Sequence, residues 1–433
     1  CDRDRPETGK RLPMSHLNNH ASDSLCRSTG MDPVSIHDMI ALSLSLCQGR
    51  QEPKSTGRNS MSKFTRRHAL ALMASATGAA CTSAGGPAVQ LGTGSEPLKD
   101  LAAAKGIRFG TAMDVREVSD PAYLDIVLRD CAVIVAENEH KMYTIQPTPD
   151  AMNWTPGDTL VAFAKANNLG MRGHTLLWQH PQWLPDWIND SDFANASEAE
   201  AVLGGYITAV ASRDADFIYS WDVVNETIDP KTGDIRETSF TRVMGPDVLE
   251  FAFRTARAAA PDATLAYNDY MSWEPSHEKH RTGVLRMLER LKRNGAPIDA
   301  LGIQSHSNDA PPSAFTPTQQ KVWRDFVEEA IGMGLDIYLT EFDVNDSMMA
   351  PGIVQRDQEI AAFTRDYLDM MFSYRETKDL LMWGLADSHS WLQGFKPRED
   401  GIEKRPTLYD SSYRPKLMRD AVAAALKAAP TRA

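Results

Sequence analysis

Cysteine is scarce in this chain, with five in 433 residues: Cys1, Cys26, Cys47, Cys81 and Cys131. Four of them lie at or before position 81, so removal of the N-terminal region would leave Cys131 without a partner in the chain. The fold therefore cannot depend on disulfides. Cys131 follows an amphipathic run, and we interpret it as a buried, unreactive thiol. No cysteine and histidine spacing typical of a zinc site is present.

The chain also lacks an excess of positive charge and a long apolar run. Lys and Arg total 46 against 58 Asp and Glu, and residues 81–433 alone carry 35 basic and 51 acidic side chains, a net charge of −16. Such an acidic body repels phosphate backbones and anionic lipid, so we expect neither nucleic acid nor a membrane surface as a partner. The apolar run at residues 69–76 is too short to span a bilayer. We expect a monomer.

The first 96 residues have the character of a leader. Residues 1–60 show no sustained apolar periodicity, and we expect Met61 to be the translation start, with residues 1–60 an untranslated or disordered upstream segment. Residues 61–81 combine a basic head, a short apolar stretch and a small-residue exit, which is typical of an export signal. Residues 82–96, rich in Gly, Ser and Pro, predict a flexible tether. We therefore expect a periplasmic or extracellular protein.

Two details of this signal leave alternatives open. The segment Thr65-Arg66-Arg67-His68 favours the twin-arginine type, with an ordinary secretory signal as the alternative. Cys81 is a candidate for a lipid anchor, although Gly78, three residues before it, fits a lipobox poorly.

From Leu98 onward, short apolar runs alternate with longer amphipathic stretches. The apolar runs predict strands at Ile107–Met113, Val133–Glu139, Met171–Trp178, Ile218–Glu226, Thr264–Tyr270, Ile298–His306, Asp336–Val344 and Leu380–Asp387. The amphipathic stretches predict helices at Pro121–Cys131, Pro156–Asn167, Glu198–Ala211, Asp247–Ala260, His277–Asn294, Gln319–Gly334 and Gln358–Arg375. Thr155 is the predicted cap of the second helix, with Pro156 at the first helical position, and Asn168-Leu169-Gly170 and Met333-Gly334 are stop signals.

This alternation implies parallel strands joined by right-handed crossovers. Eight such units predict one catalytic domain over residues 97–428, an α/β protein of the (β/α)8 TIM-barrel class. The alternative is an open doubly wound sheet. It would need a glycine-rich phosphate loop after an early strand, and the sequence has none.

Polar side chains gather where the predicted strands end. Seven of the eight ends carry acids, amides, His or Trp: Glu137-Asn138-Glu139, Gly173-His174-Thr175, Asn225-Glu226, Asn268-Asp269-Tyr270, Gln304-Ser305-His306, Thr340-Glu341-Phe342-Asp343 and Trp383–Asp387. The carboxyl ends of barrel strands meet at one face, which holds the catalytic side chains. One polar end is commonly just solvated, but seven converging ends predict an active site.

Two glutamates and several tryptophans among these residues point to glycoside hydrolysis. Cleavage needs a proton for the leaving oxygen and a carboxylate or water behind the anomeric carbon, and retaining enzymes hold the two carboxyls roughly 5–5.5 Å apart. Glu226 and Glu341 end the fourth and seventh strands and could face each other across a sugar. Trp178, Trp383 and Trp391 could stack on sugar faces, with a place in the core or in a lid as the alternative. Carboxylates alone carry out this chemistry, so we expect no metal and no organic cofactor.

Five segments together make the chain resemble glycoside hydrolase family 10, the retaining endo-β-1,4-xylanases, from about Leu98 to Leu426. They are Trp221–Glu226, Tyr338–Asp343, Gly173–Trp178, Gly302–His306, and Trp383-Gly384 with Ser390-Trp391. The resemblance implies hydrolysis of xylan or xylo-oligosaccharides through a covalent glycosyl-enzyme. It also implies that Glu226 is the general acid/base and Glu341 the nucleophile.

The resemblance implies roles for the surrounding residues as well. Asn225 would hydrogen-bond the sugar 2-hydroxyl at the cleavage point, and His306 with Asp343 would keep Glu341 ionised. The non-reducing side would be lined by Glu137, Asn138, Lys141, His174, Trp178 and Gln304, and Tyr270, Trp383 and Trp391 complete the expected substrate-binding set. We expect Asp269 to brace the mouth of the barrel rather than to react.

The chain departs from the family in two places. Family members usually carry Met and Trp around the lysine that corresponds to Lys141, where this chain has His140 and Met142. After Trp178 they usually have His and Ser, where this chain has Gln179-His180. Both departures bear on the sugar preference near the cleavage point.

Two other functions stay open. One is a retaining β-glycanase of the same clan that acts on glucan or mannan, and the other is a carbohydrate-binding barrel without activity. The set of Glu137, Asn138 and Lys141 favours xylan, and the presence of both glutamates favours an enzyme.

Overall fold

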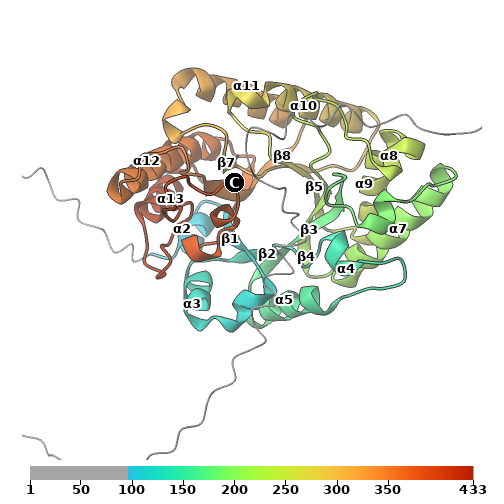
Figure 1. The fold of residues 1–433 in the computed structure, drawn as a ribbon, viewed down its shortest axis with the longest axis horizontal. Helices are drawn as coiled ribbons and strands as arrows, with labels where there is room; N and C mark the ends of the chain where they lie inside the picture. Colours follow the sequence, from blue (N-terminus) through green and yellow to red (C-terminus); the bar gives the residue numbers. More distant parts are fainter. Residues whose placement is uncertain (1–95, 433) are drawn as a thin grey trace, which may run out of the picture. The chain divides into compact units, whose positions relative to one another are not determined.

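Eight parallel strands close into a barrel in the computed structural model, which describes residues 96–432. The strands are β1 (Arg108–Met113), β2 (Val133–Ala136), β3 (Gly170–Trp178), β4 (Ile218–Asn225), β5 (Thr264–Asp269), β6 (Ala300–Ile303), β8 (Asp336–Val344) and β9 (Thr377–Met382). They pair in this order, and the pairing of β9 with β1 closes the ring. The predicted barrel is confirmed, and Figure 1 looks along it.

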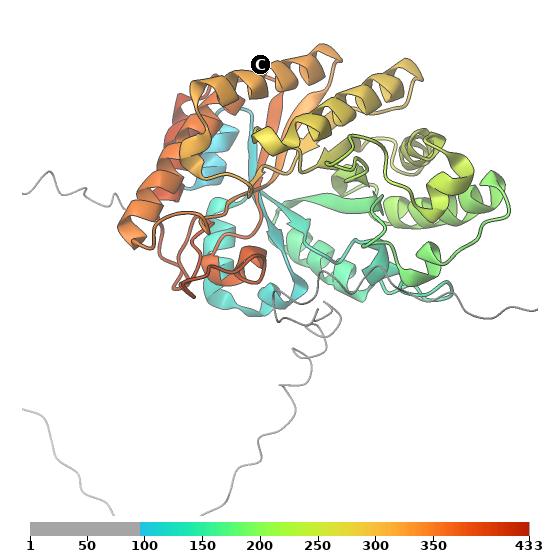
Figure 2. The same cartoon turned by 45° about the horizontal axis from the view of Figure 1, so that its top comes forward.

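Helices surround the strands, as Figures 1 and 2 show from two directions. The longer ones are α3 (Pro121–Asp130), α5 (Thr155–Ala166), α7 (Ala196–Arg213), α9 (Asp247–Ala259), α10 (Glu278–Arg293), α11 (Pro317–Gly332), α12 (Ile353–Phe372) and α13 (Leu417–Ala428). The shorter ones are α2 (Leu98–Ala103), η1 (Val115–Ser119), α4 (Met142–Ile145), α6 (Asp186–Asn189), α8 (Ser239–Met244), η2 (Pro275–His277), η3 (Pro312–Ala314), η4 (Asp387–His389) and η5 (Trp391–Gln393). The predicted helices agree with these bounds to within a few residues. The largest difference is at α12, which begins at Ile353 and not at the predicted Gln358.

Local side-chain chemistry explains several helix ends. The carboxylate of Asp120 accepts from two backbone N–H groups at the start of α3, where Pro121 takes the first helical position. The predicted cap at Thr155 was wrong: α5 begins at Thr155 itself, and no side chain caps it. The predicted stops lie as expected, with Asn168 (φ 56°) and Gly334 (φ 77°) in the left-handed backbone region that ends a helix.

The predicted strand Ile298–His306 is interrupted in the structure. β6 ends at Ile303, Ser305 adopts a left-handed φ of 62°, and a separate short strand β7 (His306–Ser307) follows. β7 pairs with the end of β8, where His306 lies opposite Asp343. A positive φ is uncommon for a residue other than glycine, and here it redirects the chain at the mouth of the barrel.

Two other strands are shorter than predicted. β2 ends at Ala136 rather than Glu139, and β9 ends at Met382 rather than Asp387. After β9, Gly384 adopts a φ of 85°, which glycine tolerates because it has no Cβ atom. The polar residues that follow these strands therefore lie in turns at the mouth and not within the strands.

The barrel interior holds charged side chains. Arg172 on β3 and Asp222 on β4 are fully buried, with Nη2 and Oδ1 2.5 Å apart. The other carboxylate oxygen of Asp222 lies 2.9 Å from Nδ1 of His174. A buried charge is costly unless it is paired, so these three residues depend on one another. The network holds His174 in place near the mouth.

Cys131 is fully buried and has no disulfide partner, as predicted. Burial raises the pKa of its thiol, which keeps the thiol protonated and unreactive.

The predictions for the N-terminal region, namely the start at Met61, the export signal and lipidation of Cys81, lie outside the described residues. So does all but the last residue of the tether, and within residues 96–432 no helix is both long and apolar enough to cross a membrane.

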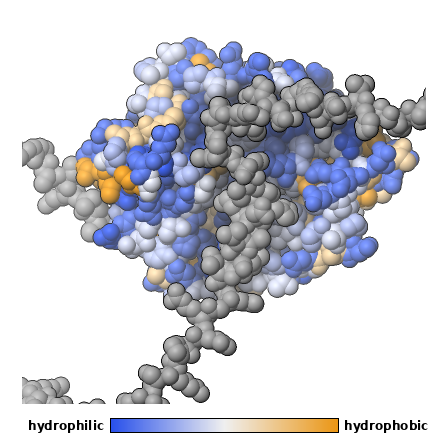
Figure 3. Space-filling view, viewed as in Figure 1, coloured by the Kyte–Doolittle hydropathy of each residue, from blue (hydrophilic) through white to orange (hydrophobic). Residues whose placement is uncertain are grey.

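The visible surface of the described residues is mostly hydrophilic, and its apolar atoms form small separate patches (Figure 3). The large exposed apolar side chains of this region are Met348, Ile353, Val354, Phe395 and Ile402. They come from two neighbouring segments, the β8–α12 loop with the first turn of α12 and the chain between β9 and α13.

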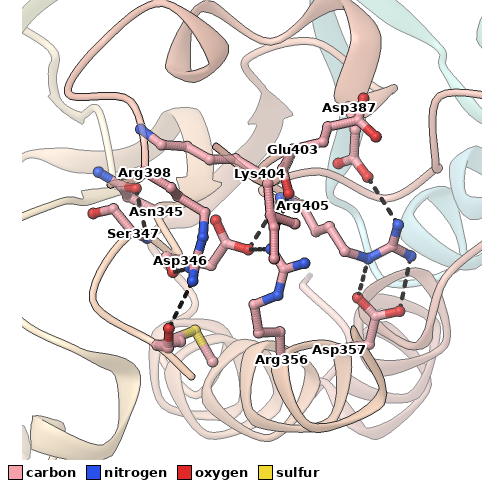
Figure 4. Close-up of polar contacts among 12 residues, drawn as sticks. Asn345, Asp346, Ser347, Arg356, Asp357, Asp387, Arg398, Glu403, Lys404 and Arg405 are labelled. Atoms are coloured by element: carbon pink, nitrogen blue, oxygen red, sulfur yellow. Dashed lines mark hydrogen bonds and ion pairs between the residues drawn. The ribbon is translucent and has the colours of Figure 1, made fainter. Parts of the chain in front are cut away.

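A buried polar network joins these two segments (Figure 4). Asp346, fully buried after β8, accepts from Nη1 of Arg356 at 2.5 Å and from the backbone N–H of Arg405 at 3.2 Å. Arg405 also binds both oxygens of Asp357, at 2.7 and 2.8 Å. Nη2 of Arg398 donates to the backbone of the β8–α12 loop. The network fixes two loops that border the mouth of the barrel.

We expect Asp346→Ala to lower the free energy of unfolding by about 3–5 kcal/mol, because it removes the carboxylate from a buried ion pair and leaves the Arg356 charge without it. Urea unfolding followed by circular dichroism measures the change. The matched control is Asp325→Ala, which breaks an exposed pair with Lys321 and should change stability little. Equal effects of the two substitutions would contradict this account.

Candidate active site

A cavity of about 540 Å³ lies at the carboxyl ends of the strands, a volume typical of a small-molecule site. Of the fourteen predicted site residues, twelve line it: Glu137, Asn138, Lys141, His174, Trp178, Glu226, Tyr270, Gln304, His306, Glu341, Trp383 and Trp391. The other two, Asn225 and Asp343, are buried and contact lining residues. The structure thus brings the whole predicted set to one place.

Glu341, on β8, is held as a carboxylate. Its side chain accepts from Nδ2 of Asn268 at 2.8 Å, and its other oxygen lies 3.2 Å from Nε2 of His306. Burial alone would raise the pKa of Glu341, but the hydrogen bond from His306 and the surrounding positive charges lower it below its usual range.

His306, on β7, is held from its other side by Asp343. Nδ1 of His306 lies 2.8 Å from Oδ1 of Asp343, and the indole N–H of Trp391 donates to the second oxygen of Asp343 at 2.8 Å. Burial by itself would lower the pKa of His306, but the two carboxylates outweigh it and raise the pKa to about 10. His306 is therefore a cation at neutral pH and donates from both ring nitrogens.

Glu226 follows β4 directly and has the opposite surroundings. Its backbone adopts a left-handed φ of 53°, and its Oε1 accepts from Nε2 of Gln304 at 2.9 Å. Burial raises the pKa of Glu226 above its usual range, and the negative charge of Asp269 raises it further. Among the described residues, no cation forms an ion pair with this carboxyl, so the protonated form is favoured.

Amides from the two strands between β4 and β8 contact the glutamates. Asn268 on β5 donates to Glu341, and the hydroxyl of Thr340 donates to the Asn268 oxygen at 2.7 Å, which fixes the orientation of the amide. Gln304, after β6, donates to Glu226. Each glutamate is thus positioned by a strand other than its own.

Asn225 orients the indole of Trp178. With its amide turned so that both polar atoms find partners, its side-chain oxygen accepts from Nε1 of Trp178 at 3.2 Å, and its nitrogen donates to the backbone carbonyl of Asn268 at 3.1 Å. The ammonium of Lys141 lies 4.5 Å from the centre of the Trp178 ring, and the ring of Trp183 stacks on Trp178 with a centroid distance of 4.8 Å. Trp178 therefore already has protein partners at its ring, and Trp183 extends the aromatic surface.

A polar group from the β2–α4 connection forms one side of the cavity. Nζ of Lys141 donates to the side-chain oxygen of Asn138 at 3.3 Å, and the hydroxyl of Tyr143 donates to the same oxygen at 2.8 Å. Burial raises the pKa of Glu137 to about 7, with the charge of Lys141 acting in the opposite direction. This side offers both donors and acceptors to a hydroxyl-rich ligand.

Tyr270, which Arg236 contacts, forms the other side, next to Glu226. Nη2 of Arg236 donates to the hydroxyl of Tyr270 at 2.9 Å, and Nε of Arg236 donates to the backbone carbonyl of Glu226 at 3.0 Å. Asp269 is fully buried below Tyr270, whose backbone N–H donates to it at 2.8 Å. Asp269 therefore supports this side of the mouth.

The two departures from the family differ in where they lie. His140 and Met142 are buried and do not line the cavity; His140 packs against Trp221 with a centroid distance of 5.4 Å. Gln179 is fully buried and donates to the hydroxyl of Thr238 at 2.8 Å. His180 does line the cavity.

Several residues of the site are absent from the predicted set. They are Asn268, which contacts Glu341, and the lining residues Tyr143, His180, Trp183, Glu274, His277, Asn308, Asp309, Phe395 and Lys396. Asn268 has a sequence signal, because it ends a predicted strand. The others lie outside the strands, where apolar periodicity gives no signal.

Glu274, His277 and Asp309 have ligand atoms within 4.8 Å of one another, and within residues 96–432 they are the one group of this kind. Oε1 of Glu274 already accepts from two backbone N–H groups, and Nε2 of His277 lies 3.2 Å from Asp309. Nζ of Lys396 lies 3.4 Å from Asp309. The carboxylate oxygens and Nε2 of His277 thus already have partners, and the neighbouring ammonium opposes a bound cation.

Comparison with known proteins agrees with this geometry. The model of glycosyl hydrolase family 10 matches residues 97–425. Endo-1,4-beta-xylanase A of Fusarium oxysporum f. sp. lycopersici is 32% identical over 310 residues, which are 69% of this chain and 92% of that protein.

Solved structures are similar as well. Native xylanase 10B of Thermotoga maritima has a TM-score of 0.69 and 31% identity, covering 76% of this chain and 98% of its own. Xylanase 10B of Thermotoga petrophila RKU-1, solved in complex with xylobiose, has a TM-score of 0.67 and 30% identity, covering 76% and 97%. With a family match over three quarters of its length and a cavity that holds both glutamates, this chain belongs to glycosyl hydrolase family 10.

Proposed function

We propose that this protein hydrolyses internal β-1,4-xylosidic bonds of xylan with retention of configuration. The observation that carries the mechanism is the opposite surroundings of two glutamates in one cavity. Glu341 contacts the cation His306, whereas Glu226 contacts a neutral amide and lies near a second carboxylate. Family membership and the xylanases among the relatives support the substrate class.

In the first step, a carboxylate oxygen of Glu341 attacks the anomeric carbon, and the bond from this carbon to the leaving oxygen breaks. The leaving oxygen takes the proton of Glu226, so the leaving sugar departs as an alcohol. The depressed pKa of Glu341 and the elevated pKa of Glu226 put both groups in the required state. A covalent glycosyl-enzyme results.

In the second step, Glu226 is a carboxylate and acts as the base. It takes a proton from a water molecule, whose oxygen attacks the anomeric carbon and releases Glu341. Two inversions at the same carbon give net retention. His306 enters the reaction protonated, because its pKa of about 10 lies well above neutral pH, and Asp343 keeps its contact with the ring when Glu341 is esterified.

Binding of the substrate uses the two sides of the cavity. Asn138 and Lys141 lie on the side that we assign to the non-reducing end, with Glu137 as a hydroxyl acceptor. In this proposal Asn225, next to Glu226 in the chain, hydrogen-bonds the sugar 2-hydroxyl at the point of cleavage. Xylan is a polymer, so the proposal includes export through the signal predicted at residues 61–81.

Replacing each glutamate separately should identify its role through the configuration of a rescued product. We expect Glu341→Ala to lose at least about 10³-fold of its turnover of an aryl β-xylobioside, because the glycosyl-enzyme cannot form. Added azide should then give the α-azide by direct displacement. In Glu226→Ala, azide should instead attack the glycosyl-enzyme and give the β-azide, as read by NMR.

The control is Glu329→Ala, an exposed glutamate on α11 outside the cavity, which should retain full activity. A β-azide from Glu341→Ala, or unchanged turnover by either variant, would show that the roles are assigned wrongly.

The pH profile should reveal the contact between His306 and Glu341. Catalysis requires ionised Glu341 and protonated Glu226, so kcat/KM falls below the pKa of Glu341 and above the pKa of Glu226. In His306→Gln the positive charge is lost and burial dominates, which raises the pKa of Glu341. We expect the acid limb for xylopentaose to move to higher pH while the alkaline limb stays in place. A uniform loss of rate without a shift of the limb would refute this coupling.

Substrate class is tested by comparing an aryl β-xylobioside with an aryl β-cellobioside on the full chain. We expect kcat/KM to favour the xylobioside by at least about ten-fold, since such a ratio needs only about 1.4 kcal/mol of differential binding. Preference for the cellobioside would keep the mechanism and move the substrate to glucan. If folded protein turned over neither, the carbohydrate-binding barrel without activity would be the better description.

A further inference from the structure

The β3–α6 loop (residues 179–185) carries two lining residues that the proposed mechanism does not use, His180 and Trp183. Backbone hydrogen bonds hold the loop in place. The N–H of Gln179 donates to the carbonyl of Asn225 at 3.0 Å, and the N–H of Trp183 donates to the carbonyl of His180 at 2.9 Å. These two side chains are therefore presented to the cavity by a fixed backbone.

His180 presents a neutral N–H group. Its Nδ1 accepts from the backbone N–H of Gln182 at 3.1 Å, and Nε2 has no partner within residues 96–432. Burial lowers the pKa of His180 to about 4, and the charge of Arg236 acts in the same direction. The ring is therefore neutral at neutral pH, and because Nδ1 is an acceptor, the proton lies on Nε2. His180 is half-buried and lines the cavity, so this donor is available to a ligand.

Trp183 presents an aromatic surface. It is half-buried, lines the cavity and stacks on Trp178 at an interplanar angle of 18°. An indole that remains partly open in a hydrophilic cleft exposes apolar area, and the C–H face of a pyranose can cover such a surface. An aromatic platform beside an N–H donor matches a sugar, which has an apolar face and hydroxyls at its edge.

His180 follows Gln179, whose backbone is hydrogen-bonded to Asn225, so the loop runs beside Glu226. Arg236, the cation that acts on His180, also contacts the backbone of Glu226 and the hydroxyl of Tyr270. Glu226 must face the leaving oxygen in order to protonate it. A sugar that lies against Glu226 and Tyr270 is therefore the leaving group.

We propose that His180 and Trp183 form a binding subsite for the leaving-group sugar, in which Trp183 stacks on the pyranose and Nε2 of His180 donates to one of its hydroxyls. This inference rests on the proposed function and deepens it. The subsite is built from the loop where the sequence departs from its family, and it sets how strongly the enzyme holds a sugar beyond the point of cleavage.

The test uses His180→Ala and Trp183→Ala with two substrates, xylopentaose and an aryl β-xylobioside, of which only xylopentaose places a sugar on the leaving-group side. We expect kcat/KM for xylopentaose to fall about ten-fold in each variant, several-fold more than for the aryl xylobioside. Trp183→Phe should recover most of the loss, because it keeps an aromatic ring.

A second readout separates binding from structural damage. A glycosyl-enzyme formed from the aryl xylobioside can transfer its sugar to water or to added xylobiose, which must bind on the leaving-group side. We expect the ratio of transfer to xylobiose over hydrolysis to fall about ten-fold in both alanine variants. Gln182→Ala, an exposed side chain on the same loop, should leave this ratio unchanged.

Equal losses on both substrates with an unchanged transfer ratio would mean that the loop is only structural, and would overturn the subsite. Unchanged kinetics in both alanine variants would overturn it as well. If the unmodified chain turned over neither substrate, the proposed function itself would fail. That outcome is seen without any variant, so the two failures can be told apart.

Discussion

The contact between His306 and Glu341 is the interaction on which the rest of the site depends. A carboxyl that is only 5% exposed stays ionised only if a cation compensates for the lost water. His306 is such a cation because Asp343 contacts its other nitrogen, and Asp343 is in turn held by the indole N–H of Trp391. The ionised state of Glu341 on β8 therefore depends on three further side chains, those of His306 on β7, Asp343 on β8 and Trp391 on η5.

The same cavity favours the protonated form of Glu226, although Glu226 and Glu341 are residues of the same type. Its partner is the amide of Gln304, which donates a hydrogen bond but carries no charge. The negative charge of Asp269 adds to the effect of burial. What separates the two glutamates is thus the partner that each one contacts, because His306 on β7 lies beside Glu341 whereas Gln304 donates to Glu226. Because each strand of the closed barrel has different neighbours, two residues of the same type on different strands can differ in pKa.

The sequence was sufficient for the barrel and for the convergence of the polar strand ends, because both follow from apolar periodicity and from parallel strand order. It was insufficient where a single backbone angle decides whether the chain continues in the direction of the strand. Ser305 and Gly384 turn the chain through positive φ, so that the residues after them leave the strand direction. Nothing in a hydrophobic pattern signals the turn at Ser305. Asn268 was placed correctly at a strand end, but its contact with Glu341 depends on a neighbouring strand, which one-dimensional spacing cannot show.

Loops supply the remaining features of the cavity, and they are held in two different ways. The mouth beside β8 and β9 is fixed by buried ion pairs such as Asp346 with Arg356, whereas the β3–α6 loop is fixed by backbone hydrogen bonds and by the side chain of Gln179. Backbone contacts tolerate changes of side chain, so the residues of the second loop can vary without loss of the fold. This explains why the chain departs from its family beside Trp178 and not at the glutamates. The strand ends carry the chemistry, and a loop held largely by its own backbone is the place where recognition of the leaving group can change.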